Sequence, residues 1–391
     1  MRDKPRLGVA MIGYAFMGAA HSNAWATAPR AFDLPLVPDM AVLVGRDRAA
    51  ASAAAERLGW REVETDWRAV LDRSDVDVVD ICTPGDSHME IAIAALAAGK
   101  HVMCEKPLAN TLEQALAMTD AAEQARGVGV RAMVGFNYRR VPALALAREW
   151  IGEGRLGTVY QVRAAYRQDW AADPESPLVW RLQRERAGSG ALGDIGSHIV
   201  DLAQYLLADT LRGVTAVEET FVRERPLSQA DGCGPVDVDD CAMFIGRFGG
   251  GAMASFEATR FAVGRKNALQ IEVNGSNGSV GFDLEALNEL QYYDGREDPS
   301  TAGFRRVLVT DPKHPYMSAW WPAGHIIGWE HTFTNQVADF VSAIAAGDNP
   351  RPSFEDGLQV QRVLAAVSES ALNDSRWTTV GARAGASVEA A

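Results

Sequence analysis

The chain is poor in cysteine and in positive charge, and each shortage excludes a class of protein. Its four cysteines, at positions 82, 104, 233 and 241, are too few for a disulfide framework, and their spacings fit neither a zinc site nor a redox pair. Lysine and arginine number 38 against 51 aspartate and glutamate, so the formal net charge is −13. A surplus of this sign repels nucleic acid and anionic membrane surfaces.

Long apolar runs are also lacking. No stretch is long and apolar enough to span a bilayer, and residues 1–6 carry no apolar signal segment ahead of the first predicted strand. We therefore expect a cytoplasmic protein with no nucleic-acid partner, no membrane partner and no metal site. With 391 residues, of which 47% are hydrophobic and 23% charged, the chain has the composition of a globular protein of two or more domains.

Strand-like and helix-like segments alternate over the first third of the chain. Strands are predicted at 7–12, 40–44, 76–81, 101–104 and 131–135, with helices at 49–58, 88–97 and 112–124. This alternation predicts an α/β fold with a parallel, doubly wound sheet that is covered by helices on both faces.

The remainder has a different pattern. Strands are predicted at 159–167, 238–248, 252–259, 269–274 and 280–283, and glycine-rich links at 249–251 and 274–278 join two pairs of them as hairpins. Helices are predicted at 142–152, 194–207, 332–346 and 357–372. We expect domains at 1–136 and 137–391, the second an α+β domain with a large, mostly antiparallel, open-faced sheet, and its last helices packing back on the first domain. The uncovered face of that sheet predicts a homodimer or homotetramer.

A strand-to-helix turn near the N-terminus has the pattern of a dinucleotide-binding loop with one glycine missing. Gly13 permits the bend and Gly18 permits close packing of helix on strand, but Ala15 stands where a second glycine would let the backbone approach the pyrophosphate. The pyrophosphate would lie at the helix N-terminus. The alternative is an ordinary strand, turn and helix.

Two further turns follow strands of the predicted parallel sheet, at the edge where such sheets bind ligands. One contains Thr83 and Pro84, and the other contains Glu105, Lys106 and Pro107. A lysine held at a strand end by a proline can point into a cleft and polarise a substrate hydroxyl. Plain strand-to-helix loops are the alternative.

The predicted helix 194–207 carries Asp194, His198, Asp201 and Tyr205 at helical spacing, on a line displaced from its apolar stripe. A carboxylate one turn from an imidazole can fix its tautomer, stabilise its protonated form and tune it as a base. The alternative is that Asp194 caps the helix and His198 is a half-buried structural residue.

Five motifs in this order resemble the Gfo/Idh/MocA family, the glucose-fructose oxidoreductase and inositol dehydrogenase family. They are the turn at Gly13, the Thr83-Pro84 turn, Glu105-Lys106-Pro107, the segment from Gly135 to Arg140, and Gly193-Asp194 with His198 and Asp201. Segments 168–170, 177–181 and 187–190 are similar to the levoglucosan dehydrogenase branch. The resemblance implies a Rossmann domain and a nicotinamide-dependent dehydrogenase that acts on a secondary hydroxyl, or its ketone, of a sugar, anhydrosugar or cyclitol.

The resemblance implies that Lys106, Asp194 and His198 form the catalytic set. In this interpretation His198 takes the hydroxyl proton, Asp194 orients His198, and Lys106 binds the hydroxyl, although Lys106 could itself be the base. Two other functions stay open. One is a glycosidase that uses bound NAD for transient oxidation and elimination, and the other is a non-catalytic dinucleotide-binding sensor.

The choice between NAD and NADP depends on the end of the predicted strand 40–44. Gly45 stands where an acid would hold the adenosine ribose, and Arg46 follows, which favours NADP, although Asp47 could reach the ribose instead. We expect either cofactor. The expected cofactor-binding residues are Gly13, Ala15, Phe16, Met17, Gly18, Gly45, Arg46, Asp47, Thr83, Pro84, His88, Glu105, Lys106 and Asn137.

Sugars present apolar C–H faces with hydroxyl edges, so aromatic side chains beside charged hydrogen-bonding groups suit them. The expected substrate-binding residues are Lys106, Tyr138, Arg139, Asp169, Trp170, Trp180, Arg181, Asp194, His198, Tyr316 and His325.

Overall fold

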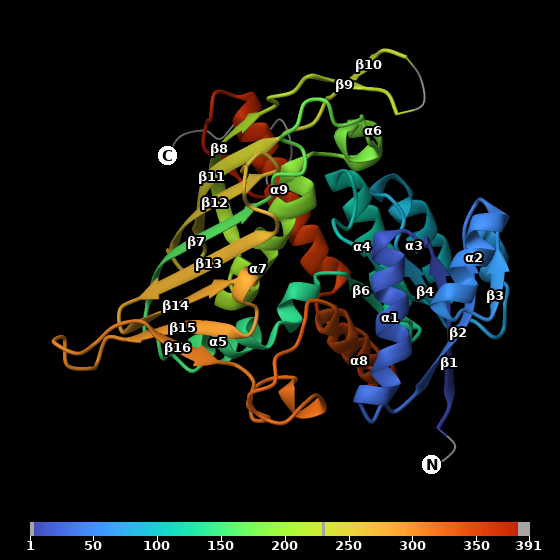
Figure 1. The fold of residues 1–391 in the computed structure, drawn as a ribbon, viewed down its shortest axis with the longest axis horizontal. Coiled ribbons are helices and arrows are strands. Elements are labelled where there is room, and N and C mark those ends of the chain that lie inside the picture. Colours follow the sequence, from blue (N-terminus) through green and yellow to red (C-terminus); the bar gives the residue numbers. More distant parts are fainter. Residues whose placement is uncertain (1–3, 229–230, 382–391) are drawn as a thin grey trace.

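The computed structural model describes residues 4–228 and 231–381, and its first part is a parallel sheet. The strand order is β3-β2-β1-β4-β5-β6, with all neighbours parallel, as predicted (Figure 1). The strands are β1 Arg6–Ile12, β2 Val37–Val44, β3 Glu62–Glu64, β4 Val78–Ile81, β5 His101–Cys104 and β6 Ala132–Val134. The helices that follow them are α1 Phe16–Ala31, α2 Arg48–Leu58, α3 His88–Ala97 and α4 Leu112–Gly127.

Strand β1 shows why this sheet is covered on both faces. Its side chains alternate between two apolar clusters, with Val9 and Met11 in one and Ala10 and Ile12 in the other, so the strand is apolar almost throughout. The first cluster contains Trp25 of α1 together with residues of α8, Glu330–Ala346. Helix α8 thus packs along α1, although the two are far apart in the sequence (Figure 1).

The second part is a nine-stranded sheet in the order β16-β15-β14-β13-β7-β12-β11-β8-β17. Neighbouring strands are antiparallel, as predicted, except that β7 and β12 are parallel. The strands are β7 Val159–Arg167, β8 Leu211–Glu219, β11 Cys241–Phe248, β12 Met253–Thr259, β13 Ala268–Gly275, β14 Gly278–Asp283, β15 Glu289–Asp294, β16 Arg305–Leu308 and β17 Thr378–Thr379. Strands β9 Glu224–Pro226 and β10 Cys233–Pro235 form a separate pair.

Within the residues that the structure describes, helices cover one face of the large sheet and leave the other without a helix. Helix α5, Pro142–Gly152, packs on β14 and β15, α7, Ser197–Leu207, packs on β7 and β13, and α9, Phe354–Leu372, packs on β8 and also on α4 and β6. Figure 1 shows these helices between the two sheets, with the other face of the large sheet open. The short helix α6, Arg184–Ala187, lies in the segment before α7.

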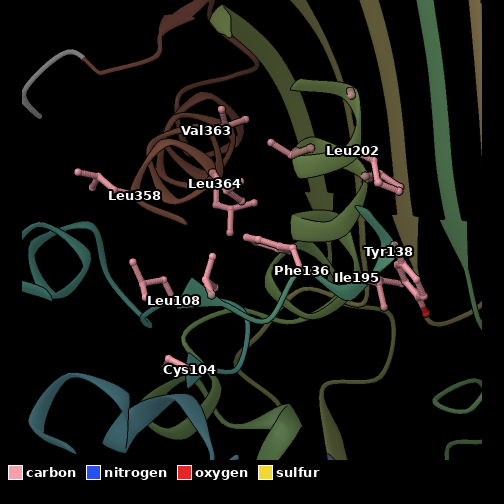
Figure 2. Close-up of a cluster of buried hydrophobic side chains, with 14 of the residues drawn as sticks. Cys104, Leu108, Phe136, Tyr138, Ile195, Leu202, Leu358, Val363 and Leu364 are labelled. Carbon is pink, nitrogen blue, oxygen red and sulfur yellow. The ribbon is translucent and has the colours of Figure 1, made fainter. Parts of the chain in front are cut away.

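The core between the two sheets is built from these same helices. Leu358, Val363 and Leu364 of α9, Leu202 of α7 and Phe136 all belong to one buried apolar cluster, and Phe136 lies between the ends of the two helices and the segment that carries Leu108 (Figure 2). Because α9 also contacts α4 and β6, this core joins the two parts of the chain.

The sequence prediction missed several strands and one helical turn. The strands β3 and β16 are short, and at least half of their residues are charged, as edge strands often are, so they lack the alternating apolar pattern. The helix expected at 194–207 begins earlier, because a π-helical turn at Leu192–Gly196 runs into α7. No helix within residues 4–228 and 231–381 is long and apolar enough to cross a membrane.

Candidate active site

A cleft of about 850 Å³ opens where the carboxyl-terminal edge of the parallel sheet faces the large sheet. The turns after β1, β4 and β5 form one wall, which is the topological switch point of the sheet, where such folds bind ligands. The expected site residues that line this cleft are Ala15, Phe16, Met17, Thr83, Pro84, His88, Glu105, Lys106, Asn137, Tyr138, Trp170, Trp180, Arg181, Asp194 and His198.

The turn after β1 has the geometry of an anion-binding loop. Gly13 has φ +100°, and a Cβ there would lie 2.9 Å from the Cys82 carbonyl oxygen, while a Cβ on Gly18 would lie 2.1 Å from the Gly13 carbonyl oxygen. Ala15 is the N-cap of α1 at φ −71° and ψ −159°, and no side chain caps this helix end. The first-turn N–H groups are therefore available to a phosphate, and the backbone at Ala15 needs no glycine conformation.

Position 45, at the end of β2, has no room for the acidic side chain that would hold the adenosine ribose. A Cβ on Gly45 would lie 2.0 Å from Cε1 of Tyr14, so the Tyr14 ring occupies the space that an acidic side chain would need. Asp47 caps α2 by accepting the Ala50 N–H at 3.1 Å, so contact between Asp47 and a ribose would compete with this cap. Arg46 is exposed.

The Lys106 ammonium reaches across the cleft to the helix that carries Asp194. It donates to the Asp194 carbonyl oxygen at 2.8 Å and to Asp194 Oδ1 at 3.1 Å. Asp194 lies in the π-helical turn Leu192–Gly196, and such turns recur at functional sites. Asp194 does not cap the helix, because the Asp239 carboxylate accepts the N–H groups of Gly190 and Leu192 at 2.6 and 2.7 Å.

His88 connects the two turns that flank Lys106. Its Nε2 lies 2.9 Å from the Thr83 carbonyl oxygen, and its Nδ1 lies 3.1 Å from the Pro107 carbonyl oxygen. Although His88 lines the cleft, its ring nitrogens face the backbone, so it holds the Thr83 and Lys106 turns together.

The expected pairing of Asp194 with His198 is wrong. No hydrogen bond joins the two side chains, because Asp194 Oδ1 accepts from Lys106 and Oδ2 accepts from Arg260 Nη2 at 3.1 Å. His198 instead packs against the Tyr138 ring, with centroids 4.6 Å apart. Its Nδ1 is buried and has no hydrogen-bond partner in the described part of the chain.

The charge states of these two residues follow from their surroundings. Burial alone would raise the pKa of Asp194, but the charges of Lys106, Arg260 and Arg181 outweigh it and lower that pKa. Burial lowers the pKa of His198 well below its ordinary value; the Lys106 charge adds to this effect, and Asp194 opposes it. Asp194 is therefore ionised at pH 7, and His198 is a neutral imidazole that can accept a proton.

Polar side chains connect along the wall of the cleft formed by the large sheet. The Tyr138 and Tyr166 hydroxyls are 2.8 Å apart, and Tyr166 donates to Asn267 Oδ1 at 2.7 Å. Gln168 donates to the same Asn267 oxygen at 2.7 Å and accepts from Trp170 Nε1 at 3.0 Å. We call this hydrogen-bonded set, Tyr138, Tyr166, Asn267 and Gln168, the polar seam. It offers a substrate several fixed hydroxyl-binding groups beside the partly exposed Trp170 ring.

Sequence analysis missed half of the residues that line the cleft, among them Tyr166, Gln168, Arg260, Asn267, Trp329 and Phe333. Tyr166 and Gln168 lie at the carboxyl end of a predicted strand, which is a usable sign. Asn267 and Arg260 lie in loops with no motif. Trp329 precedes α8 and stacks on Phe16 at the start of α1, with centroids 5.4 Å apart.

Four expected substrate residues do not line the cleft, and these predictions are corrected. Arg139 is buried in a two-point ion pair with Asp201, at 2.9 and 2.5 Å. Asp169 accepts from Lys266 at 2.7 Å and from the Gly264 N–H at 3.0 Å. Each side chain is thus held by another part of the protein.

The other two are Tyr316 and His325. The Tyr316 hydroxyl donates to Asp339 at 2.9 Å, on the side of α8, and the exposed His325 lies 2.8 Å from the Pro322 carbonyl oxygen. The expected cofactor residues Gly13, Gly18, Gly45, Arg46 and Asp47 are also outside the lining of this cleft, at or beyond the glycine turn.

Comparison with known proteins assigns the chain to a family. Residues 7–136 match the family model described as an oxidoreductase family with an NAD-binding Rossmann fold, and residues 144–281 match the GFO/IDH/MocA C-terminal domain. The chain is 45% identical over 388 residues to levoglucosan dehydrogenase of Pseudarthrobacter phenanthrenivorans, an alignment that covers 96% of this chain and 98% of the relative.

Solved structures agree. An oxidoreductase domain protein from Kribbella flavida is 61% identical, with a TM-score of 0.94 over 97% of this chain and 100% of the other. A levoglucosan dehydrogenase in complex with NADH and levoglucosan is 45% identical, with a TM-score of 0.92 over 96% of this chain and 100% of the other. The chain therefore belongs to the GFO/IDH/MocA family and is an NAD(P)-dependent oxidoreductase that acts on CH–OH groups.

Proposed function

We propose that the protein oxidises a secondary hydroxyl of levoglucosan or a closely related anhydrosugar, with NAD as the hydride acceptor. The observation that carries this proposal is the neutral His198 beside the ion pair of Lys106 and Asp194, in a cleft that begins at the glycine turn. The relative solved with NADH and levoglucosan supports the substrate class.

Lys106, His198 and Asp194 have separate roles in this proposal. The Lys106 ammonium binds the substrate hydroxyl and favours its alkoxide form, while the neutral His198 takes the hydroxyl proton. Asp194 holds Lys106 in place through two hydrogen bonds and does not contact His198. Because the Lys106 nitrogen is already held as a donor, His198 fits the role of base better.

The bound cofactor supplies the hydride acceptor. The α1 N-terminus and the turn at Gly13 would hold its pyrophosphate, and the Thr83 and Lys106 turns would flank its reactive end. Trp170, Trp180 and the polar seam would hold the sugar. Arg181 stacks over the Trp180 ring at 4.5 Å and forms no ion pair within the described residues, so its guanidinium can bind a sugar hydroxyl.

For the cofactor, Gly45 and Arg46 at the end of β2 favour NADP, whereas a solved relative contains NADH. We propose NAD, and we assign Arg46 as the residue that would bind a 2′-phosphate. Parallel titrations test this: Arg46→Ala should weaken NADP binding about tenfold and leave NAD binding unchanged. An equal loss of affinity for NAD and NADP would show that Arg46 does not bind the 2′-phosphate.

The deciding experiment assays a panel of anhydrosugars, sugars and cyclitols with NAD and NADP, following cofactor reduction at 340 nm. Levoglucosan with NAD should give the highest kcat/KM. Lys106→Ala should abolish turnover while NAD binding stays measurable, and a fully active Lys106→Ala enzyme would refute the catalytic set. The exposed Lys313 provides the matched control, Lys313→Ala, which should stay active.

The same assay separates the two other functions. A glycosidase that only oxidises transiently would release sugar products with no net cofactor reduction. A non-catalytic sensor would bind the dinucleotide tightly and reduce none of it with any member of the panel. We also propose a cytoplasmic location, because the cysteines at positions 82, 104, 233 and 241 form no disulfide bonds, as is usual in a reducing compartment.

A further inference from the structure

Arg260 is a fully buried cation that lies just beyond the end of β12, next to the catalytic groups. Its Nη2 donates to Asp194 Oδ2 at 3.1 Å and to the Gly190 carbonyl oxygen at 2.8 Å, and its Nη1 donates to the Arg181 carbonyl oxygen at 3.2 Å. The guanidinium carbon also lies 5.1 Å from the Trp170 ring centroid. One side chain therefore contacts the catalytic carboxylate and two segments that carry expected sugar-binding residues.

A buried guanidinium is costly unless its charge is compensated, and Asp194 is the carboxylate that compensates it. The two carboxylate oxygens are divided between two cations. Lys106 holds Oδ1 and Arg260 holds Oδ2, each at 3.1 Å. Without Arg260, Oδ2 would need another donor, and the side chain one helical turn away is His198.

We propose that Arg260 is a positioning residue that keeps the Asp194 carboxylate on Lys106 and off His198, and so leaves the His198 imidazole free to take the substrate proton. This inference rests on the proposed catalytic roles of Lys106 and His198. Arg260 itself is placed to act through Asp194, because both of its Nη atoms donate to protein acceptors.

Among the groups that face His198, Asp194 is the one that can stabilise its protonated form. Lys106 and Asp194 act on it through their charges, while the Tyr138 and Tyr166 rings pack against it with centroids 4.6 and 5.9 Å away. Burial raises the pKa of both phenols, so they stay neutral in the working range. If Asp194 turned to His198, it would stabilise the imidazolium, and the base would be protonated at a higher pH.

The test compares pH profiles of kcat/KM for the wild type, Arg260→Gln and Arg260→Lys, with levoglucosan and NAD. In Arg260→Gln we expect the acid limb to move up by about one pH unit or more and kcat to fall about 100-fold, with NAD affinity within about twofold of wild type. Arg260→Lys should recover part of both losses. The matched control is Arg265→Gln, an exposed residue of the same loop whose ion pair in the described part of the chain is with Glu285, and it should keep the wild-type profile.

Folding is checked by circular dichroism. Should Arg260→Gln fail to fold, Arg260→Met replaces it, because its apolar chain fills similar space without an unpaired polar group. An acid limb unchanged from wild type in the folded variant, or a loss of activity that Arg260→Lys does not recover, would overturn the inference. Failure of the proposed function is distinguishable, since it would show as an active Lys106→Ala enzyme, whatever Arg260 does.

Discussion

At the scale of single residues, the cleft keeps His198, the proposed proton acceptor, apart from the Asp194 carboxylate, which would otherwise stabilise its protonated form. His198 is buried against aromatic rings, and Asp194 is held by two cations, so the imidazole stays uncharged while the carboxylate stays charged. A base of this kind does not need to lose a proton before substrate binds.

This arrangement predicts the pH dependence of the reaction. Because burial and Lys106 lower the pKa of His198, the acid limb of kcat/KM should lie well below the pH of about 6.5 at which a free histidine titrates. A pH–rate profile between pH 4.5 and 9 measures it. An acid limb at or above pH 6.5 would contradict the assignment of His198 as a neutral base.

Ala15 gives a second prediction at this scale. Its φ is −71°, so a glycine there relieves no strain, and Ala15→Gly should change the Kd of NAD by less than about threefold. Gly13→Ala is the contrasting variant, since position 13 has φ +100° and its Cβ would meet the Cys82 carbonyl oxygen. It should weaken NAD binding strongly or destabilise the fold. A large gain in affinity for Ala15→Gly would show that the methyl group does obstruct the pyrophosphate.

At the scale of elements, a buried imidazole ties α1 to two strands of the parallel sheet. His21 of α1 lies with Nδ1 2.9 Å from Asp80 of β4 and Nε2 3.0 Å from Glu105, directly after β5. Trp25 donates to Asp80 as well, at 2.7 Å. Burial opposes the charged imidazolium, but the Asp80 carboxylate outweighs it and raises the pKa of His21 well above its ordinary value.

His21→Gln should therefore destabilise the protein by about 3–5 kcal/mol, because it leaves two buried carboxylates without their cation. His21 binds its proton more tightly in the folded state, so its stabilisation is complete below about pH 6.5 and is lost as the pH rises through the raised pKa. Denaturant unfolding at pH 6 and pH 9 checks both statements, and the difference between wild type and variant should shrink at pH 9. The exposed His325→Gln is the control, with an expected change under about 0.5 kcal/mol.

Elements with strong local patterns were predictable from the sequence. The bounds of α3, α5, β5 and β7 agree with the predicted ranges, since apolar periodicity and the flanking glycine and proline residues mark them. Strand β3 was missed because two of its three residues are charged.

Only those site residues that lie in local sequence motifs were predictable. The turns at Gly13, Thr83 and Lys106 and the segment around Asp194 and His198 are local patterns, and they do meet in the cleft. The contact between Arg260 and Asp194 joins residues 66 positions apart and has no pattern in the sequence. For the same reason, the burial of Arg139 against Asp201 could not be known before α7 was placed beside it.

At the scale of the whole molecule, the open face of the large sheet is an uncovered surface that carries several apolar side chains. Val217 of β8 pairs with Met243 of β11, and together with Ile245 they are about half exposed around a hollow of about 940 Å³. Ion pairs between Arg163 and Glu272 and between Arg167 and Glu257 lie on the same face. We propose that a second copy of this chain covers it.

Sedimentation equilibrium or size-exclusion chromatography with light scattering tests this proposal. Wild type should run as a dimer or tetramer, and the double variant Met243→Glu, Ile245→Glu should dissociate to monomers, because it would bury charge in the contact. The control is the single change Leu116→Glu at an exposed position of helix α4, which should leave the mass unchanged. A monomeric wild type would refute the proposal.

The packing of α8 along α1 has a consequence for how the chain comes to be folded. The apolar side of α1, which includes Trp25, packs in one cluster with Phe333 and Val337 of α8. These two residues are synthesised about 300 residues later, so at about 5–20 residues per second this side of α1 stays uncovered for roughly 15–60 s. A nascent chain interrupted before residue 330 would therefore expose the apolar side of α1 to chaperones and proteases. We therefore expect the first half of the chain to be prone to aggregation until α8 has been synthesised.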